Sequence, residues 1–508
     1  MAKWIGTVRQ KTAHLSENGF WKKLSVWSCI LAAVCILIPL FYYSGYNFIC
    51  LDDYSIGAQT HLAWEQREGF FSGIGGVLSS VAQRVGAIYM GWGGNYSSMI
   101  FTSLQPAVFH EELAVLNTYI LLGIFVAANL YFFRKLFCRK FRFSWETTAV
   151  MAAGVLILST QWLPSAVEGF YWFNGSFYNI AGYAMGLVFV VNMYEIAWGG
   201  HKGRMFYVVT ALVGIFVAGT NYTTMLFLML LGGASLLGLL CVDGRTEQKR
   251  GYLILYLIFL AFCFVNILAP GNSVRQGDFE RMGIVASIFN ALVYGREMYL
   301  QETNARLLIF YVVLLPFLLE DLKKIRFRFP CPVVFSAVVY LLFSAMFAPT
   351  LCALHSTGPD RTQNVYYWAV ILLHLCNYVY WLGWLQKSLE KAGHKLKALE
   401  HGKLYLNHFC LCAILLFVFL TQMDISAMTS FTVMRSVASG EARQWKEEME
   451  ARREILQDPQ IPDVVLEPVS VCPELLYMGE VDEDADFWVN LAIAQWYQKN
   501  SVVLRSSE

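Results

Sequence analysis

The chain is poor in charge and lacks the short motifs that identify common cofactor and metal sites. Only 15% of its 508 residues are Asp, Glu, Lys or Arg, and the formal net charge is +1. It has no basic stretch of the kind that binds nucleic acid, so we expect no nucleic-acid partner. It also has no CxxC pair, HExxH, P-loop or GxGxxG before a helix. We therefore expect no organic cofactor.

Apolar residues dominate instead. They make up 57% of the chain, and the mean hydropathy is +0.47, which is typical of a membrane protein. Most of the twelve cysteines lie inside apolar segments, where they serve as small packing residues. The first apolar run, about 24–43, is long enough to span a bilayer and too long for a cleavable signal.

Apolar windows of spanning length predict about eleven transmembrane helices. Their expected bounds are 24–43, 113–133, 146–163, 177–196, 205–220, 225–241, 251–268, 305–320, 332–350, 365–386 and 404–422. The predicted fold class is an all-α polytopic membrane protein, with a transmembrane module over 1–422 and a small C-terminal α/β domain over 423–508. In that tail we expect a helix over 426–457, a strand at 463–466 and a helix over 485–497.

Positive charge alternates between the loops. About 24 of the 38 Lys and Arg residues lie in the N-terminal arm and in every second loop, the last being 387–403. The positive-inside rule places the N-terminus in the cytoplasm and, after an odd number of spans, the C-terminus outside. The outer side then holds a long first loop, 44–112, with amphipathic stretches that suit the membrane interface. A second large outer loop covers 269–304.

An acid pair follows the first span directly. Asp52 and Asp53 lie just past the apolar run, where an ionised side chain is costly and therefore points to function. Such a carboxylate can act as general base on a sugar hydroxyl, or can hold a divalent cation (Mg²⁺ or Mn²⁺) against a phosphate. The alternative is structural, because Asp53 is a suitable N-cap for a helix that starts at Tyr54.

One short outer loop combines an acid with aromatic residues. Glu168, Tyr171 and Trp172 lie within five positions of each other, and aromatic faces beside a hydrogen-bonding acid suit a sugar ring. The alternative is the aromatic belt of the membrane interface, which explains Tyr171 and Trp172 but not Glu168.

Two arginines lie on the expected outer side, whose loops are nearly free of Lys and Arg. Arg275 follows a Pro270-Gly271 helix end, and Arg361 follows Gly358-Pro359; both are candidates for gripping a phosphate. The alternative for Arg275 is a snorkelling side chain, and His355 is more typical of a structural histidine.

In order and spacing, these segments resemble the GT-C class of integral-membrane glycosyltransferases. The resemblance is closer to a bacterial branch of polytopic proteins related to phage-type O-antigen glucosyltransferases. The matching segments are Leu51–Tyr54, Trp92–Tyr96, Glu168–Trp172, Ala269–Arg275 and Phe487–Asn490. The chain departs from those relatives at Gly94-Asn95, where they carry Gly-Arg. The contact of that Arg is then absent here or supplied by Arg84.

The resemblance implies an inverting transfer on the outer face of a bacterial cytoplasmic membrane. The donor would be a polyprenyl-phosphate-linked sugar, and the acceptor a cell-surface glycan or lipid. Asp52 or Asp53 would serve as base or metal ligand. Substrate binding would fall to Glu168, Tyr171, Trp172, Tyr96, Asn95, Arg275, Arg361 and His355.

Two other function classes are compatible with the same residues. One is a transporter or flippase for a lipid-linked or anionic solute, which would need charges near the middle of its spans; the spans here are nearly uncharged there. The other is a non-catalytic membrane scaffold. Convergence of the acids and an arginine on one cavity favours an enzyme, and dispersal of these side chains favours a scaffold.

Overall fold

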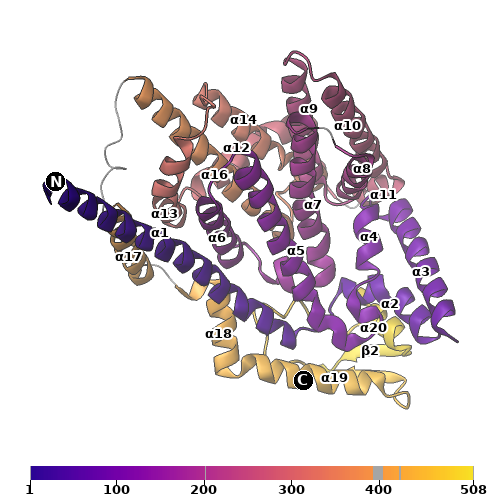
Figure 1. The fold of residues 1–508 in the computed structure, drawn as a ribbon. Coiled ribbons are helices and arrows are strands. Elements are labelled where there is room, and N and C mark those ends of the chain that lie inside the picture. Colours follow the sequence, from indigo (N-terminus) through magenta and orange to yellow (C-terminus); the bar gives the residue numbers. More distant parts are fainter. Residues whose placement is uncertain (1, 201, 278, 393–403, 423–424, 507–508) are drawn as a thin grey trace.

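The computed structural model describes residues 2–200, 202–277, 279–392, 404–422 and 425–506. Most of the basic loop 387–403 and the start of the expected tail domain at 423 therefore lie outside the described residues. The chain is an α-helical, multi-pass membrane protein (Figure 1).

Seventeen helices precede the tail in the described part of the chain. They are α1 Ala2–Tyr43, α2 Asp52–Glu65, α3 Phe70–Gly91, α4 Tyr96–Thr102, α5 Leu116–Phe132, α6 Trp145–Gln161, α7 Phe173–Trp198, α8 Arg204–Ala218, α9 Tyr222–Leu240, α10 Thr246–Ile267, α11 Pro270–Gln276, α12 Ile284–Gln301, α13 Ala305–Leu322, α14 Pro332–Ala345, α15 Ala348–Leu354, α16 Asp360–Lys391 and α17 Leu404–Gln422.

Seven segments among the described residues are long and apolar enough to cross a membrane. They are Gly19–Tyr46, Glu111–Lys140, Phe173–Trp198, Tyr222–Leu240, Thr246–Ile267, Pro332–Leu354 and Asp360–Lys391. The other four predicted spans are also helices, α6, α8, α13 and α17. Their crossing of a membrane, and hence the count of eleven, stays a prediction.

Aromatic side chains build the centre of the bundle. Phe125, Phe170, Tyr183 and Trp368 pack ring against ring, with centroids 4.9 to 5.7 Å apart. The indole Nε1 of Trp368 donates to the Ser159 carbonyl at 3.1 Å, so its polar atom is satisfied inside the core. This cluster ties α5, α6, α7 and α16 together beneath the functional site described below.

The segment 44–112, which we expected as a long first outer loop, is largely helical and lies against the bundle. Helices α2 and α3 cover the two amphipathic stretches, and α3 leaves Phe70, Phe71 and Leu78 exposed. Such an apolar face suits a membrane interface. In Figure 1, α3 and α11 lie side by side at one edge of the molecule.

The segment 269–304, which we expected as a second large loop between spans, is largely helical. It forms α11 and α12, and α12 packs on α14, where the Tyr340 hydroxyl donates to the Leu292 carbonyl at 2.7 Å. The outer face of α12 exposes Ile284, Ile288 and other apolar side chains. The adjacent charges Arg296 and Glu297 lower the hydropathy of this window, and this is why the sequence pattern missed the helix.

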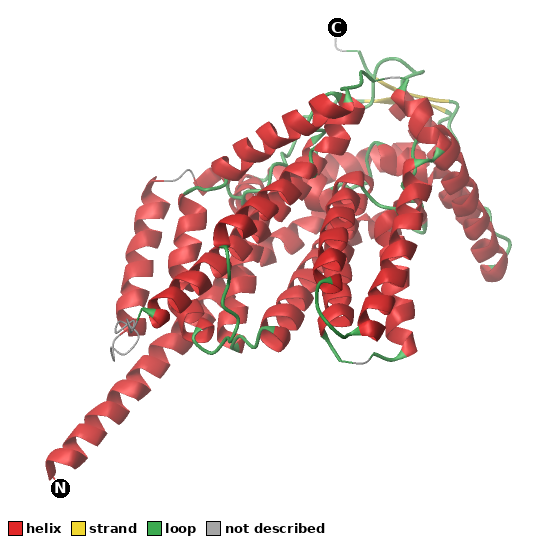
Figure 2. Cartoon of the chain, turned by 90° about the horizontal axis from the view of Figure 1, so that it is seen from above, coloured by secondary structure: helices red, strands yellow, loops and turns green. Residues whose placement is uncertain are grey.

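The tail contains three helices and two short strands, α18 Thr429–Ser439, α19 Glu441–Gln457, β1 Asp463–Leu466, α20 Trp488–Tyr497 and β2 Ser501–Leu504. The expected helix over 426–457 is divided at Gly440, whose φ of 85° lies in the left-handed region that favours glycine. Strand β1 is where we predicted it, and it pairs in parallel with β2, which we did not predict. Figure 2 shows the strands at the far end of the bundle from the N-terminus.

The tail packs on the segment between α1 and α5. The Trp496 ring stacks on His61 with centroids 4.1 Å apart, and its Nε1 donates to Glu111 at 3.0 Å. Residues of α2 such as Ala58 share one apolar core with Val464 and Val502 of the tail. A separate domain that begins at 423 therefore stays a prediction.

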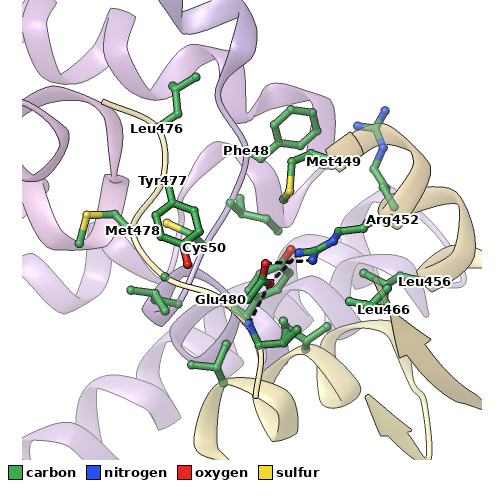
Figure 3. A pocket seen from close by; sticks show the side chains of 18 of the residues that line it. Phe48, Cys50, Met449, Arg452, Leu456, Leu466, Leu476, Tyr477, Met478 and Glu480 are labelled. Atoms are coloured by element: carbon green, nitrogen blue, oxygen red, sulfur yellow. Dashed lines mark hydrogen bonds and ion pairs between the residues drawn. The ribbon is translucent and has the colours of Figure 1, made fainter. Parts of the chain in front are cut away.

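A small cavity of about 60 Å³ remains where the tail meets the Phe48–Leu51 segment (Figure 3). Its wall contains the ion pair between Arg452 and Glu480, with Nη1 and Oε1 2.7 Å apart. Most of its other lining is apolar. The tail therefore packs against Phe48–Leu51, the segment that leads into Asp52 and Asp53.

Candidate functional site

The main cavity, of about 500 Å³, lies where the first turn of α2 meets five other parts of the chain. These are α3 with the segment that leads from it into α4, the start of α7, the turn between α8 and α9, α11, and the junction of α15 with α16. Its charged lining residues are Asp52, Arg84, Arg275 and Arg361. Four charges in one cavity of a chain this poor in charge indicate a binding site for a polar ligand.

The two acids of the pair point to different surroundings. Helix α2 begins at Asp52, directly after Leu51, whose φ of 47° is unusual for a non-glycine residue. Asp52 is half-buried and lines the cavity. Asp53 is fully buried, and its carboxylate accepts the backbone N–H groups of Cys50 at 3.3 Å and Asn174 at 3.0 Å. Asp53 is not the N-cap that the structural alternative expected, because α2 begins at Asp52 and its N-cap is Leu51. Its role is still structural, since it joins the start of α2 to that of α7.

Burial raises the pKa of both acids. For Asp53 it raises the pKa to about 8, against the opposing effect of the two N–H donors, and the charge of Asp52 raises it further. For Asp52, burial raises the pKa while the positive charges of Arg361 and Arg84 lower it. At neutral pH Asp53 is therefore largely protonated, and Asp52 is the acid placed to act on a ligand.

Glu168 lies behind the cavity and neutralises Arg361. Its Oε1 accepts from Arg361 Nη1 at 2.9 Å, and its Oε2 accepts the Arg361 backbone N–H at 2.7 Å. Arg361 Nε donates to the Tyr178 hydroxyl, and the guanidinium lies 5.4 Å from the centroid of the Trp172 ring. Arg361 is thus held in one position, with its charge already balanced.

Arg84 and Arg275 are not held by a direct ion pair of this kind, although the negative charge of Asp52 acts on Arg84. Within the described residues neither forms an ion pair, and the buried Nε atom of each has no hydrogen-bond partner. The Arg275 guanidinium lies 4.9 Å from the Trp92 ring centroid and 5.7 Å from that of Phe279, so aromatic faces hold it at the cavity wall. Two cations without a direct ion pair suit an anionic ligand.

Two segments that are far apart in the sequence meet at this wall. The Gly94 N–H donates to Asn272 Oδ1 at 3.2 Å, and the Tyr222 hydroxyl donates to the same oxygen at 2.6 Å. A Cβ at Gly94 would lie 2.0 Å from the Asn266 carbonyl oxygen, so this close approach requires glycine. The contact fixes Asn95 and the helix that carries Arg275 in a common wall.

The cavity includes four of the ten predicted site residues, Asp52, Asn95, Arg275 and Arg361. It also includes Asn174, Tyr178 and Asn179, which we did not predict. Tyr178 lies one helical turn after Asn174 on α7, the helix that follows the predicted 168–172 loop. Helical spacing from that loop is the sequence signal that could have identified it. Arg84 was detectable as the single charge between residues 70 and 91.

Six predicted residues lie outside the cavity lining. Two of them, Asp53 and Glu168, are described above, and the other four are Tyr171, Trp172, Tyr96 and His355. Tyr171 is fully buried and donates to the Leu40 carbonyl at 3.0 Å, and Trp172 is buried beneath Arg361. The Tyr96 hydroxyl donates to the Ile215 carbonyl at 3.0 Å. His355 lies at the end of α15, with Nδ1 3.8 Å from an oxygen of Glu280. None of these four side chains lines the cavity.

Of the acid pair, only Asp52 lines the cavity, whereas Asp53 is buried and both of its oxygens accept backbone N–H groups. A metal held by both acids stays a prediction. No cluster of three or more His, Cys, Asp or Glu suited to a metal occurs within the described ranges. The divalent cation stays a prediction, and no step below depends on it.

Comparison with known proteins adds no assignment. No family model, curated protein or solved structure matches the chain. What the site can do therefore has to be argued from its own residues.

Proposed function

We propose that the chain is a membrane glycosyltransferase that moves a sugar from a polyprenyl-phosphate donor to a cell-surface glycan or lipid. One observation carries the proposal. A single cavity joins a carboxylate, Asp52, to two arginines, Arg84 and Arg275, that form no direct ion pair within the described residues. A transfer site needs these parts, a base for the acceptor and cations for the leaving phosphate.

The charges of the cavity match a phosphodiester. Arg361 is balanced by Glu168, and Asp52 balances one of the two remaining arginines. One positive charge is left, which suits the single negative charge of a sugar–phosphate–polyprenyl diester. Arg84 and Arg275 would hold its phosphate with charge-assisted hydrogen bonds, and the apolar face of α3 would lie toward the lipid chain.

The proposed step is a direct displacement at the anomeric carbon. The acceptor hydroxyl oxygen attacks C1 and its proton moves to Asp52. The bond between C1 and the phosphate oxygen breaks, its electron pair stays on that oxygen, and the configuration at C1 inverts. Burial raises the pKa of Asp52, which makes it a stronger base, and the positive charges of Arg361 and Arg84 oppose that rise.

Orientation is part of the proposal. With the N-terminus in the cytoplasm, the cavity and the tail face the outside of a bacterial cytoplasmic membrane. A transporter of an anionic solute would use the same arginines but would not depend on a base at Asp52. A scaffold would depend on neither.

The experiment is an analysis of surface glycans in a strain that lacks the protein. We expect one sugar to be missing, to return with the wild-type chain, and to stay missing with Asp52→Asn at equal membrane abundance. Restoration by Asp52→Asn would favour transport. An unchanged glycan in the deletion strain would contradict the proposal.

A further inference from the structure

Asn179 is a buried amide in the cavity wall without hydrogen-bond partners. It is 1% exposed, and within the described residues neither Nδ2 nor Oδ1 is bonded. A buried amide without partners is costly, so each case in a folded protein calls for an explanation. Five residues earlier, Asn174 leaves its Oδ1 without a partner as well, although its Nδ2 donates to the Asp52 carbonyl at 3.1 Å.

The residues that α7 and the α8–α9 turn contribute to the cavity lining are polar but neutral. They include Asn221 and Thr223 and no charged side chain. Asn221 is satisfied, because its Nδ2 donates to the Tyr178 carbonyl and its Oδ1 accepts the Thr224 N–H. The free hydrogen-bonding capacity of this wall is therefore concentrated on Asn179 and on one atom of Asn174.

We propose that Asn179, with Asn174 Oδ1, forms a subsite for the hydroxyl groups of a neutral sugar. This inference rests on the proposed function and extends it. A sugar hydroxyl both donates and accepts, so it can pair with the carbonyl oxygen and the amino group of one amide. The subsite is separate from the Arg84 and Arg275 pair, which binds the phosphate. It replaces Glu168, Tyr171 and Trp172 as the sugar-contacting set.

The test separates sugar binding from phosphate binding with two kinds of probe. One is synthetic decaprenyl phosphate, and the other is decaprenyl phosphate carrying glucose, galactose or N-acetylglucosamine. Dissociation constants are measured by thermophoresis on the purified full-length protein in detergent. We expect at least one sugar to tighten binding over decaprenyl phosphate alone. If no sugar of the panel does so, the subsite is contradicted.

Asn179→Ala should remove the gain due to the sugar and leave decaprenyl phosphate unaffected. We expect a loss of roughly fivefold to tenfold, the effect of one or two neutral hydrogen bonds. Arg275→Ala should weaken both probes by similar factors. Asn117→Ala is the matched control, because Asn117 is equally buried and unbonded but lies on α5, away from the cavity; it should change neither.

Melting temperature distinguishes this role from a structural one. Asn179 has no bond to lose, so Asn179→Ala should melt close to wild type without ligand, whereas Asn221→Ala should melt lower. Asn179→Ser is the second variant should Asn179→Ala not fold. Equal weakening of both probes by Asn179→Ala would contradict the subsite and leave the proposed function standing. Binding of neither probe by wild type would contradict both.

Discussion

Replacing Glu168 with Gln should destabilise the protein through Arg361. The change removes the negative charge opposite a guanidinium whose side chain is only 25% exposed, and the Glu168 side chain is 10% exposed. Breaking a buried pair by removing one partner costs about 3–5 kcal/mol. Because Arg361 keeps the Tyr178 hydroxyl and the Trp172 ring, we expect the lower end, about 3 kcal/mol.

That cost translates into a small but measurable change in melting temperature. Unfolding entropy of about 2.1 cal/mol/K per residue, taken over 508 residues, gives a shift of about 1 °C per kcal/mol. Glu168→Gln should therefore melt about 3 °C below wild type in detergent. The matched control is Glu447→Gln, because Glu447 pairs with Arg443 in the same way but both side chains are more than 60% exposed; it should change the free energy of unfolding by less than about 1 kcal/mol.

A double-mutant cycle makes the result specific. Glu168→Gln combined with Arg361→Gln should be less destabilised than the sum of the two single changes, because the double variant has no unpaired buried charge. Additive effects, or a Glu168→Gln variant that melts like wild type, would refute the assignment of Glu168 as the partner that holds Arg361.

Two further predictions concern Asp53 at the start of α2 and the contact between α2 and the tail. Since the folded-state pKa of Asp53 is about 8 and that of an unfolded carboxyl is about 3.9, the stability that Asp53 contributes is complete below pH 4 and is lost as the pH rises to 8. Melting temperatures of wild type should fall across that window relative to Asp53→Asn, and parallel curves would argue against the assignment. Trp496→Ala removes the ring stacked on His61 and the bond to Glu111, a loss of about 3–5 kcal/mol. Limited proteolysis should then cut the tail faster than in wild type while α5–α7 stay protected, and an unchanged cleavage rate would contradict a docked tail.

The helices and three of the four charged residues of the cavity were predictable because their signals are local. Long apolar windows mark the spans. An ionised acid or arginine close to the hydrocarbon costs free energy, so its presence beside a span indicates a functional role. Asp52, Arg275 and Arg361 were found in this way, and they line one cavity. Nothing in the sequence separated Asp52 from Asp53, because that depends on how Leu51 sets the first turn of α2.

The remaining site residues depend on contacts between distant segments. Tyr171 and Trp172 are typical of a membrane interface, yet the π-helical turn at Val167–Tyr171 directs both into the core. Asn179 is one amide among many in the sequence, and only the packing of α7 against the α8–α9 turn places it in the cavity wall. Such residues carry no pattern that a single sequence can reveal.

The most direct test of the central claim is sugar transfer by the purified, full-length protein. The reaction contains a decaprenyl-phosphate-linked sugar and the isolated surface glycan of the deletion strain, and release of decaprenyl phosphate is measured. We expect transfer by wild type and Glu447→Gln, and a loss of about 100-fold or more in Asp52→Asn, the usual effect of removing a general base. Near-full transfer by Asp52→Asn would contradict the account.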